Sequence, residues 1–268
     1  MPAIQPARLK IQAAELSAKA TDPEEFCRSL HVFLDFYADR TFRPGQAGEP
    51  PPILPAYQVP KPVLRAVEKE LSQFAGSDRT AALKLVDELW DVKFMEFKLI
   101  AASILGQVNP LPATSIFRRV EAWSGPGTEE RLVRALVRDS LVRILTEDQD
   151  SYFQKVLSWL RSRKLNFNRI GLKAIPPLLE NGRFEDFPPL FKEINRKMRL
   201  SGNPLKTEIL EVIEVLARRS PDETAFFLSQ SMYSAGDNPN ITWFIRKSMK
   251  FFPPEPSRYL RETLLKGR

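Results

Sequence analysis

The chain has 268 residues, of which 43% are hydrophobic, and its 40 Lys and Arg against 33 Asp and Glu give a net charge of +7. This is enough apolar material for a sizeable core, while one cysteine (Cys27) and one histidine (His31) exclude an intrachain disulfide and a zinc site built from such ligands, and argue against Ser-His-Asp or Cys-His catalysis. We expect no metal and no cofactor, and we expect Cys27 and His31, four residues apart on a predicted helix, to be core residues.

The first twenty residues contain no long apolar run, and charge is unevenly distributed along the chain. The stretch “MPAIQPARLKIQAAELSAKA” lacks the apolar run of a signal peptide, and no window approaches the roughly 20 apolar residues of a membrane span. We therefore expect a soluble, cytoplasmic protein with no membrane partner. Residues 1–110 hold 13 Lys and Arg against 14 Asp and Glu, whereas residues 111–268 hold 27 against 19. Such a one-sided excess is typical of a protein that binds a polyanion.

Helix start signals recur along the chain, each combining an N-cap residue with a proline, a capping-box acid or the end of a preceding helix. They are Asp22 with Pro23 and Glu25, the stretch “GSD” at 76–78, and Ser220 with Pro221 and Glu223. After the first of them, the run “TFRPGQAGEPPPILPAYQVPKP” at 41–62 contains prolines that forbid a continuous helix. We expect an ordered surface loop there, after the first helix pair.

Apolar residues between these signals recur at spacings of three and four, which is typical of amphipathic helices. The run “LVRALVRDSLVRIL” at 132–145 carries one broad apolar stripe and favours helix throughout, and no convincing strand alternation occurs. Roughly a dozen or more helices, many paired in hairpins of about 40 residues, have the size of HEAT or armadillo units. We expect an all-α, right-handed α-solenoid of HEAT-like (armadillo-type) repeats, forming a single domain over residues 1–268.

Three basic clusters follow in the second half of the chain. The first places Arg131, Arg134 and Arg138 on one helix face, where the expected ion pairs are Glu130 with Arg134 and Asp139 with Arg143. The second, residues 151–179, has no acid and the cations Lys155, Arg161, Arg163, Lys164, Arg169 and Lys173. The third, “PNITWFIRKSMKFFPP” at 239–254, also lacks an acid and holds Arg246, Lys247 and Lys250.

Cations repeated once per unit would form a continuous track in a solenoid, because equivalent helices of successive repeats stack side by side. Such a track matches the charge spacing of a DNA backbone, so the missing acids predict a basic concave face that binds DNA. Acids contributed by neighbouring repeats are the alternative. The aromatic residues expected in the core between repeats are Trp90, Trp123, Trp159 and Trp243, whereas Phe251 is a candidate for contact with a nucleobase or sugar.

Four stretches, taken in order, resemble the HEAT-like-repeat family of DNA alkylation repair glycosylases. They are “YQVPKPVLRAVEKEL” with Pro62 and Arg65, “LVDELWDVKFMEFKLIAASILG” with Glu96, “WLRSRKLNFNRIGLKAIPPLL” with Arg169, and “FIRKSMKFF” with Lys247 and Phe251. In this resemblance Arg169 matches a DNA-facing arginine and Lys247 a lysine of the penultimate repeat, while Phe251 stands where the family usually has Trp. The resemblance extends over residues 57–252.

The same resemblance implies a loss of catalytic chemistry. The family's catalytic segment places a Trp one helical turn before an Asp, and in the matching run “TEERLVRALVRDSLVRIL” Glu130 stands at the Trp and Arg134 at the Asp. A carboxylate stabilises the positive sugar left by a departing alkylpurine, and a guanidinium does the reverse. We expect weak or no base excision. An active alkylpurine DNA N-glycosylase, with Glu121 or Asp139 as a relocated carboxylate, is the alternative.

Double-stranded DNA is the expected partner, contacted through its backbone independently of base sequence. The residues expected to contact it are Arg134, Arg138, Arg169, Lys173, Arg246, Lys247, Lys250 and Phe251. A protein-binding helical-repeat scaffold is the alternative from another functional class, since solenoids also bind peptides and partner helices. Acid-free cations along the concave face favour DNA, and a mixed or apolar groove favours a protein partner.

Overall fold

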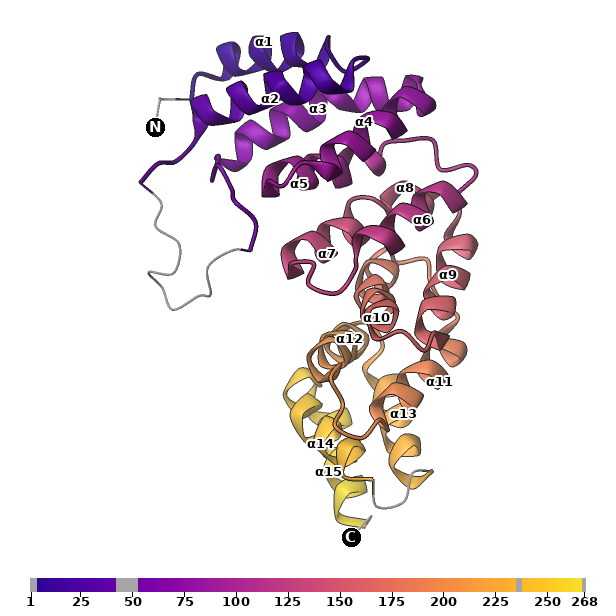
Figure 1. The fold of residues 1–268 in the computed structure, drawn as a ribbon. Coiled ribbons are helices and arrows are strands. Elements are labelled where there is room, and N and C mark those ends of the chain that lie inside the picture. Colours follow the sequence, from indigo (N-terminus) through magenta and orange to yellow (C-terminus); the bar gives the residue numbers. More distant parts are fainter. Residues whose placement is uncertain (1–3, 42–52, 235–237, 267–268) are drawn as a thin grey trace. The chain divides into compact units, whose positions relative to one another are not determined.

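A computed structural model of the chain describes residues 4–41, 53–234 and 238–266. Within these ranges it contains fifteen α-helices, one short 3-10 helix and no strand, which confirms the all-α prediction (Figure 1). None of the helices in these ranges is both long and apolar enough to cross a membrane. The chain divides into two compact units, unit 1 (Met1–Gln149) and unit 2 (Asp150–Arg268). A single domain over the whole chain stays a prediction.

Unit 1 is built from eight helices in which alternate helices pack on each other. They are α1 (Pro6–Ser17), α2 (Pro23–Tyr37), α3 (Lys61–Ser77), α4 (Arg79–Asp91), α5 (Met95–Leu105), α6 (Thr114–Trp123), α7 (Glu130–Arg138) and α8 (Val142–Glu147). α1 packs on α3, α3 on α5 and α5 on α7, while α2 packs on α4. The fully buried side chains of Phe26, Leu30, Leu71 and Leu85 lie in its core, and each contributes about 1.5–3 kcal/mol by leaving water.

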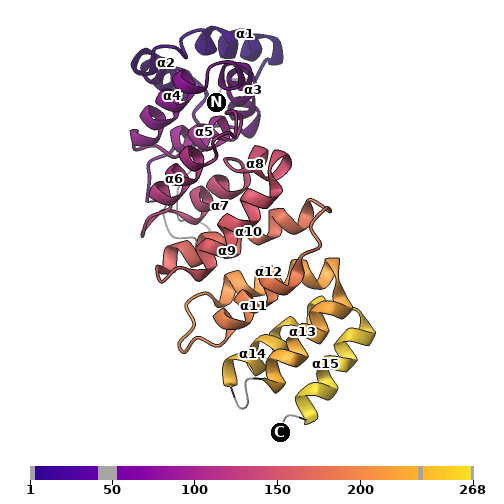
Figure 2. The same cartoon turned by 90° about the vertical axis from the view of Figure 1, so that its right-hand side faces the viewer.

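Unit 2 shows the same alternation. Its helices are α9 (Gln149–Arg161), α10 (Leu165–Glu180), α11 (Phe187–Met198), α12 (Lys206–Arg219), α13 (Pro221–Tyr233), α14 (Pro239–Ser248), the 3-10 helix η1 (Met249–Phe251) and α15 (Pro254–Lys266). α10 packs on α12 and α12 on α14, while α13 packs on α15, and Figure 2 shows these last two side by side. Helices separated by one intervening helix are therefore direct neighbours, so side chains about 40 residues apart can meet.

The three predicted helix start signals coincide with the N-caps of α2, α4 and α13. The carboxylates of Asp22 and Asp78 accept hydrogen bonds from the amides of Glu25 (3.1 Å) and Ala81 (2.9 Å), which satisfies amides that have no partner within the helix. Ser220 occupies the N-cap position of α13 but makes no capping bond through its side chain. Two of the three predicted signals thus act as side-chain caps, and the third marks only the helix boundary.

The proline-rich segment at 41–62 was predicted to be a loop, and part of it, residues 42–52, lies outside the described residues. Residues 53–60 are non-helical, as predicted, whereas α3 already begins at Lys61. The carboxylate of Glu96, only 3% exposed, accepts hydrogen bonds from the amides of Tyr57 (3.1 Å) and Gln58 (2.8 Å). Gln58 has a φ of 54°, which is unfavourable for a side chain with a Cβ, so these bonds hold a strained turn against α5.

The predicted helix across 132–145 is interrupted. α7 ends at Arg138 and α8 starts at Val142, so the apolar stripe is divided by a turn at Asp139–Leu141. The hydroxyl of Ser140 donates to the carbonyl of Ala102 on α5 (3.0 Å), and a Cβ added to Gly106 would lie 1.8 Å from the carbonyl oxygen of Asp139. The chain turns here because Gly106, at the end of α5, packs closely against the backbone of Asp139. Helical periodicity does not reveal this contact.

Cys27 and His31 belong to α2, as predicted. Cys27 is 7% exposed, and burial, with a smaller effect of Glu88, raises the pKa of its thiol to about 12. His31 is half-buried, its Nδ1 lies 2.7 Å from the Tyr57 hydroxyl, and burial lowers its pKa. No group of three or more His, Cys, Asp or Glu side chains in the described parts of the chain is arranged to hold a metal ion.

Candidate nucleic-acid interface

The residues predicted to contact DNA are distributed over both units. Arg134 and Arg138 lie on α7 in unit 1. Those in unit 2 are Arg169 and Lys173 on α10, Arg246 and Lys247 on α14, and Lys250 and Phe251 on the 3-10 helix.

The arginines of α7 lie on an exposed face. Arg131, Arg134 and Arg138 are exposed, while the apolar residues between them are buried. Arg134 Nε lies 2.8 Å from Glu130 Oε1, the ion pair that the spacing of four residues predicts. The Arg134 guanidinium is therefore beside a carboxylate, which offsets part of its charge.

The predicted ion pair between Asp139 and Arg143 is wrong. Arg143 Nε lies 2.6 Å from Glu147 Oε1, within α8. The prediction assumed one continuous helix, and the turn at 139–141 removes the helical spacing that would have joined Asp139 to Arg143.

The carboxyl groups of Glu68 and Asp139 lie near each other, and the charge of Asp139 affects the pKa of Glu68. Partial desolvation raises the pKa of Asp139, although the residue keeps an exposed surface, and Arg138 acts in the opposite direction. Burial and the nearby charge of Asp139 likewise raise the pKa of Glu68 on α3, against the lowering effect of Arg65. Of the two predicted substitutes for the catalytic Asp, Asp139 thus has an acidic neighbour that the sequence did not suggest. Glu121, the other, is half-buried on α6.

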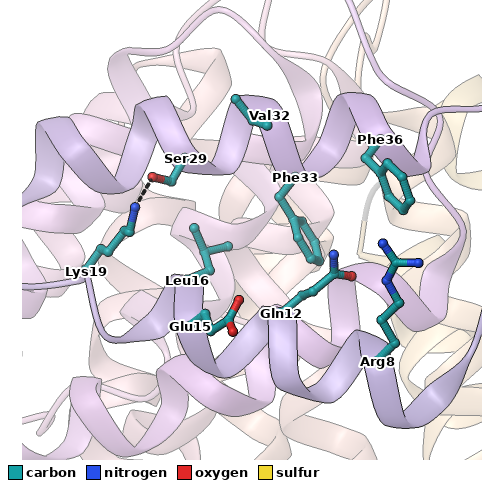
Figure 3. A pocket seen from close by; sticks show the side chains of 9 residues that line it. All are labelled: Arg8, Gln12, Glu15, Leu16, Lys19, Ser29, Val32, Phe33 and Phe36. Carbon is teal, nitrogen blue, oxygen red and sulfur yellow. Dashed lines mark hydrogen bonds between the residues drawn. The ribbon is translucent and has the colours of Figure 1, made fainter.

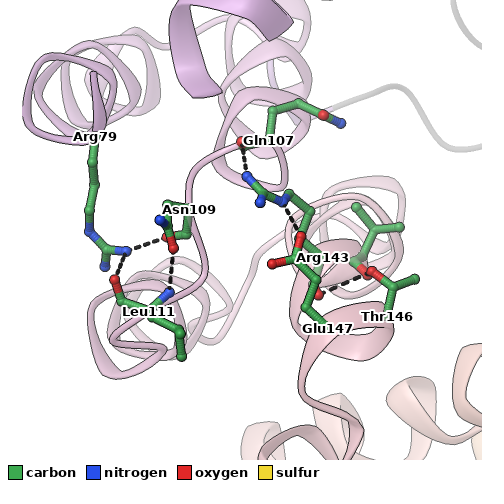
Figure 4. A network of polar contacts seen from close by, with 8 residues as sticks. Arg79, Gln107, Asn109, Leu111, Arg143, Thr146 and Glu147 are labelled. Carbon is green, nitrogen blue, oxygen red and sulfur yellow. Dashed lines mark hydrogen bonds and ion pairs between the residues drawn. The ribbon is translucent and has the colours of Figure 1, made fainter. Parts of the chain in front are cut away.

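Other cations of unit 1 hold its own backbone. Figure 4 shows Arg79, at the start of α4, whose Nη1 donates to the carbonyl oxygens of Asn109 and Leu111. The distance from Nη1 to the Leu111 oxygen is 2.6 Å. Arg143 Nη1 donates to the carbonyl oxygen of Gln107 (2.9 Å). Both guanidiniums therefore fasten the connection between α5 and α6, where they satisfy carbonyl groups that lack a helical partner.

Three cations of the acid-free run at 151–179 have acidic partners on neighbouring helices. Arg169 Nε on α10 lies 2.7 Å from Glu208 Oε1 on α12, and Glu208 is only 7% exposed. Lys173 Nζ, on the same face, lies 3.9 Å from Glu211 Oε2 on α12. Arg161 on α9 likewise pairs with a buried acid of α11, Glu193, at 2.9 Å. For these three cations the interpretation that acids are missing is wrong, because packed helices 32 to 39 residues further along supply the acids.

The last basic cluster, on α14, is exposed and lacks nearby acids, as its sequence predicts. Arg246 and Lys247 are exposed in the last turn of α14, and neither has an ion-pair partner among the residues that the structure describes. Lys250 Nζ lies 5.1 Å from the ring centroid of Phe251, which is half-buried. The position at a helix C-terminus stabilises cations by about 0.3–1 kcal/mol, so α14 tolerates them in the absence of a ligand.

Aromatic residues divide between core and surface. Trp159 is 1% exposed and belongs to the core, as predicted, and Trp90 and Trp123 stack in parallel at 4.4 Å. Trp243 on α14 is half-buried, and Lys206 Nζ from α12 lies 4.8 Å from its ring centroid. Lys206 lies outside the acid-free runs, so its sequence gives no sign that it belongs to this surface, and only the packing of α12 on α14 brings it there.

A separate pocket of about 320 Å³ lies between α1 and α2 (Figure 3). The Arg8 guanidinium lies 5.4 Å from the centre of the Phe36 ring at one end, and Lys19 Nζ donates to the Ser29 hydroxyl (2.9 Å) at the other. Glu15 lies between them. The charged side chains that line this pocket are of both signs, so the pocket lacks the uniform positive charge of a phosphate site.

Comparison with known proteins identifies the family. A family model described as DNA alkylation repair enzyme matches residues 53–250. The match therefore includes α3 to α13 and all of α14, with the basic helix end that carries Arg246 and Lys247. A search of the curated proteins and a search of the solved structures each returned no match. Because the matched residues make up well over half of the chain, the protein belongs to the DNA alkylation repair enzyme family.

Proposed function

We propose that the protein binds duplex DNA through its phosphate backbone and acts in the handling of alkylated DNA. One observation carries this proposal: Arg246 and Lys247 are exposed on α14 and lack an acidic partner in the described part of the chain. A phosphate backbone supplies the missing negative charge, and its recognition requires no base-edge contact. Membership of the DNA alkylation repair family supports DNA as the polyanion.

The arrangement proposed for this contact is a right-handed solenoid of HEAT-like repeats with its basic residues on the concave face. The neighbouring positions of α10, α12 and α14 support it, since they form a row of alternate helices. Arg246, Lys247 and Lys250 would be the main contacts. Arg169 and Lys173, already paired with acids of α12, would contribute less, although the Arg169 side chain is 41% exposed and can share its guanidinium with a phosphate.

Base excision is proposed to be weak or absent. The resemblance aligns Arg134 with the family's catalytic Asp, and the partner of Arg134, Glu130, offsets its charge without removing it. The alternative, an active alkylpurine N-glycosylase, needs another ionised carboxylate at the sugar. The candidates are Glu121 on α6 and Asp139, which has the acid Glu68 as a neighbour.

Duplex binding, followed by fluorescence anisotropy, tests the proposal. The variant with Arg246→Glu and Lys247→Glu is expected to bind labelled duplex at least about tenfold more weakly at low salt, since two phosphate contacts become repulsions. Lys192→Glu is the matched control, because Lys192 is an exposed cation of the same unit on α11. Absence of duplex binding by the wild type, or an equal loss in the control, would contradict the proposal.

A further inference from the structure

A groove between α11 and α13 in unit 2 has a composition unlike the rest of this basic chain. It measures about 710 Å³. Its aromatic residues are Phe187 and Phe191 from α11 and Phe226 and Phe227 from α13. The charged residues that line it, Glu185, Asp222 and Glu223, are all acidic. We call it the phenylalanine groove.

Stacked rings give this groove a preformed apolar floor. The rings of Phe191 and Phe227 are parallel within 7°, with centroids 4.4 Å apart, and they connect α11 to α13. Phe187 continues the stack at 5.8 Å from Phe191. Phe227 is 8% exposed and anchors the floor, whereas the adjacent Phe226 is 58% exposed. A large apolar ring is therefore presented to solvent next to rings that are already fixed by packing.

Negative charge surrounds this floor although the chain as a whole carries +7. Glu185, Asp222 and Glu223 have no ion-pair partner among the described residues. Asp222 and Glu223 lie in the first turn of α13, where the helix dipole favours acids, but Glu185 precedes α11 and lies outside any helix. Three such carboxylates repel phosphate, so the proposed binding of DNA leaves the groove unused.

We propose that the phenylalanine groove binds a segment of a partner protein in which aliphatic or aromatic side chains are flanked by lysine or arginine. The apolar side chains would cover Phe226 and pack on the stacked rings, and the cations would pair with the three carboxylates. A small-molecule site encloses most of its ligand, whereas an open groove between two helices covers one face of a peptide. Charge complementarity selects a basic segment over an acidic one.

Selection of binders from a displayed random peptide library by the intact protein tests this inference. The enriched peptides are expected to combine apolar anchors with lysine or arginine. A synthetic copy of one enriched peptide, labelled for fluorescence polarisation, should bind about tenfold or more weakly to Phe226→Ser, a loss typical of a central aromatic contact. Glu223→Lys should also weaken binding, and this effect should shrink as salt is added.

Two control variants separate the groove from general surface effects. Phe36→Ser removes a ring that is 45% exposed on α2, and Glu255→Lys reverses an acid in the first turn of α15, as Glu223→Lys does in α13. Both should bind the peptide like the wild type, and thermal melting should show all four variants folded. Duplex binding should be unchanged in Phe226→Ser, since the groove is distinct from the proposed DNA contact.

Three results would overturn the inference. They are enrichment of acidic or uncharged peptides, enrichment no greater than with Phe226→Ser as the bait, and peptide binding that is equally sensitive to the control variants. Each can occur whether or not the protein binds DNA, so failure of this inference is distinguishable from failure of the proposed function.

Discussion

Arg169 on α10 donates from Nε to a carboxylate oxygen of Glu208 on α12 across 2.7 Å, although 39 positions separate the two residues. Glu208 is buried, and the Arg169 side chain is 41% exposed. The acid therefore holds the guanidinium at the edge of the surface that we propose faces DNA. Arg169 is already paired with Glu208, so a phosphate has to compete with this carboxylate to bind the guanidinium.

We expect Glu208→Gln to strengthen duplex binding while it destabilises the fold. Loss of the carboxylate frees Arg169 for a phosphate, which should steepen the slope of log K against log salt by about 0.9. The same change replaces the carboxylate acceptor by a neutral amide oxygen and so weakens a charge-assisted hydrogen bond, at a cost of about 1–3 kcal/mol in unfolding free energy. Anisotropy titrations at several salt concentrations and urea unfolding measure the two effects.

Arg169→Gln in the same background is the control for that prediction. The double variant should lose the added salt dependence, because the freed guanidinium is gone. An unchanged slope in Glu208→Gln would show that Arg169 does not face the DNA, even if duplex binding through α14 is observed.

Gly106→Ala should destabilise unit 1 by about 1–3 kcal/mol or more, a typical cost of overpacking. The new Cβ would lie 1.8 Å from the carbonyl oxygen of Asp139, so the backbone of the turn after α7 has to move. Gly76→Ala is the matched control, because a Cβ at Gly76 meets nothing within 4 Å. In a helix that substitution should stabilise by about 0.5–1 kcal/mol. Thermal unfolding checks both, and equal shifts would refute the close contact.

Glu68→Gln should raise the melting temperature at pH 7 and have a smaller effect at about pH 4, near the ordinary pKa of a glutamate. Burial and the charge of Asp139 raise the pKa of Glu68 in the folded state, so the folded protein binds more protons than the unfolded chain between the ordinary and the raised value. Stability of the wild type therefore falls as the pH rises through this window, and the amide avoids that loss.

Melting curves at the two pH values test this prediction, with Glu70→Gln on α3 as the control for loss of one negative charge. A lower melting temperature of Glu68→Gln at pH 7 would mean that Arg65 stabilises the ionised Glu68 more than burial and Asp139 destabilise it.

Release of 3-methyladenine or 7-methylguanine from alkylated duplex under single-turnover conditions should stay close to the rate without enzyme. Loss of one well-placed electrostatic group costs about 10² to 10³ in rate, and Arg134 adds a repulsion to that loss. A no-enzyme incubation of equal length is needed, since alkylpurines also depart unaided. Release well above that control, abolished by Glu121→Gln or Asp139→Asn, would establish the glycosylase alternative and identify its carboxylate.

Local features of this protein follow from the sequence alone. The caps at Asp22 and Asp78 and the ion pair between Glu130 and Arg134 join residues three or four positions apart. Contacts this close depend on helical geometry, which a sequence pattern specifies directly. The same holds for the exposed cations in the last turn of α14, whose neighbours in the chain include no acid.

Contacts between helices were decided by the tertiary structure. Glu208 neutralises Arg169, and the approach of Gly106 to Asp139 interrupts a run whose periodicity predicts continuous helix. The groove between α11 and α13 likewise exists only where Phe191 meets Phe227. Periodicity shows which face of a helix is apolar, but the same apolar face can pack against many partners. Only the packing of helices from distant parts of the chain determines which acid meets which cation, and where a glycine lets two backbones touch.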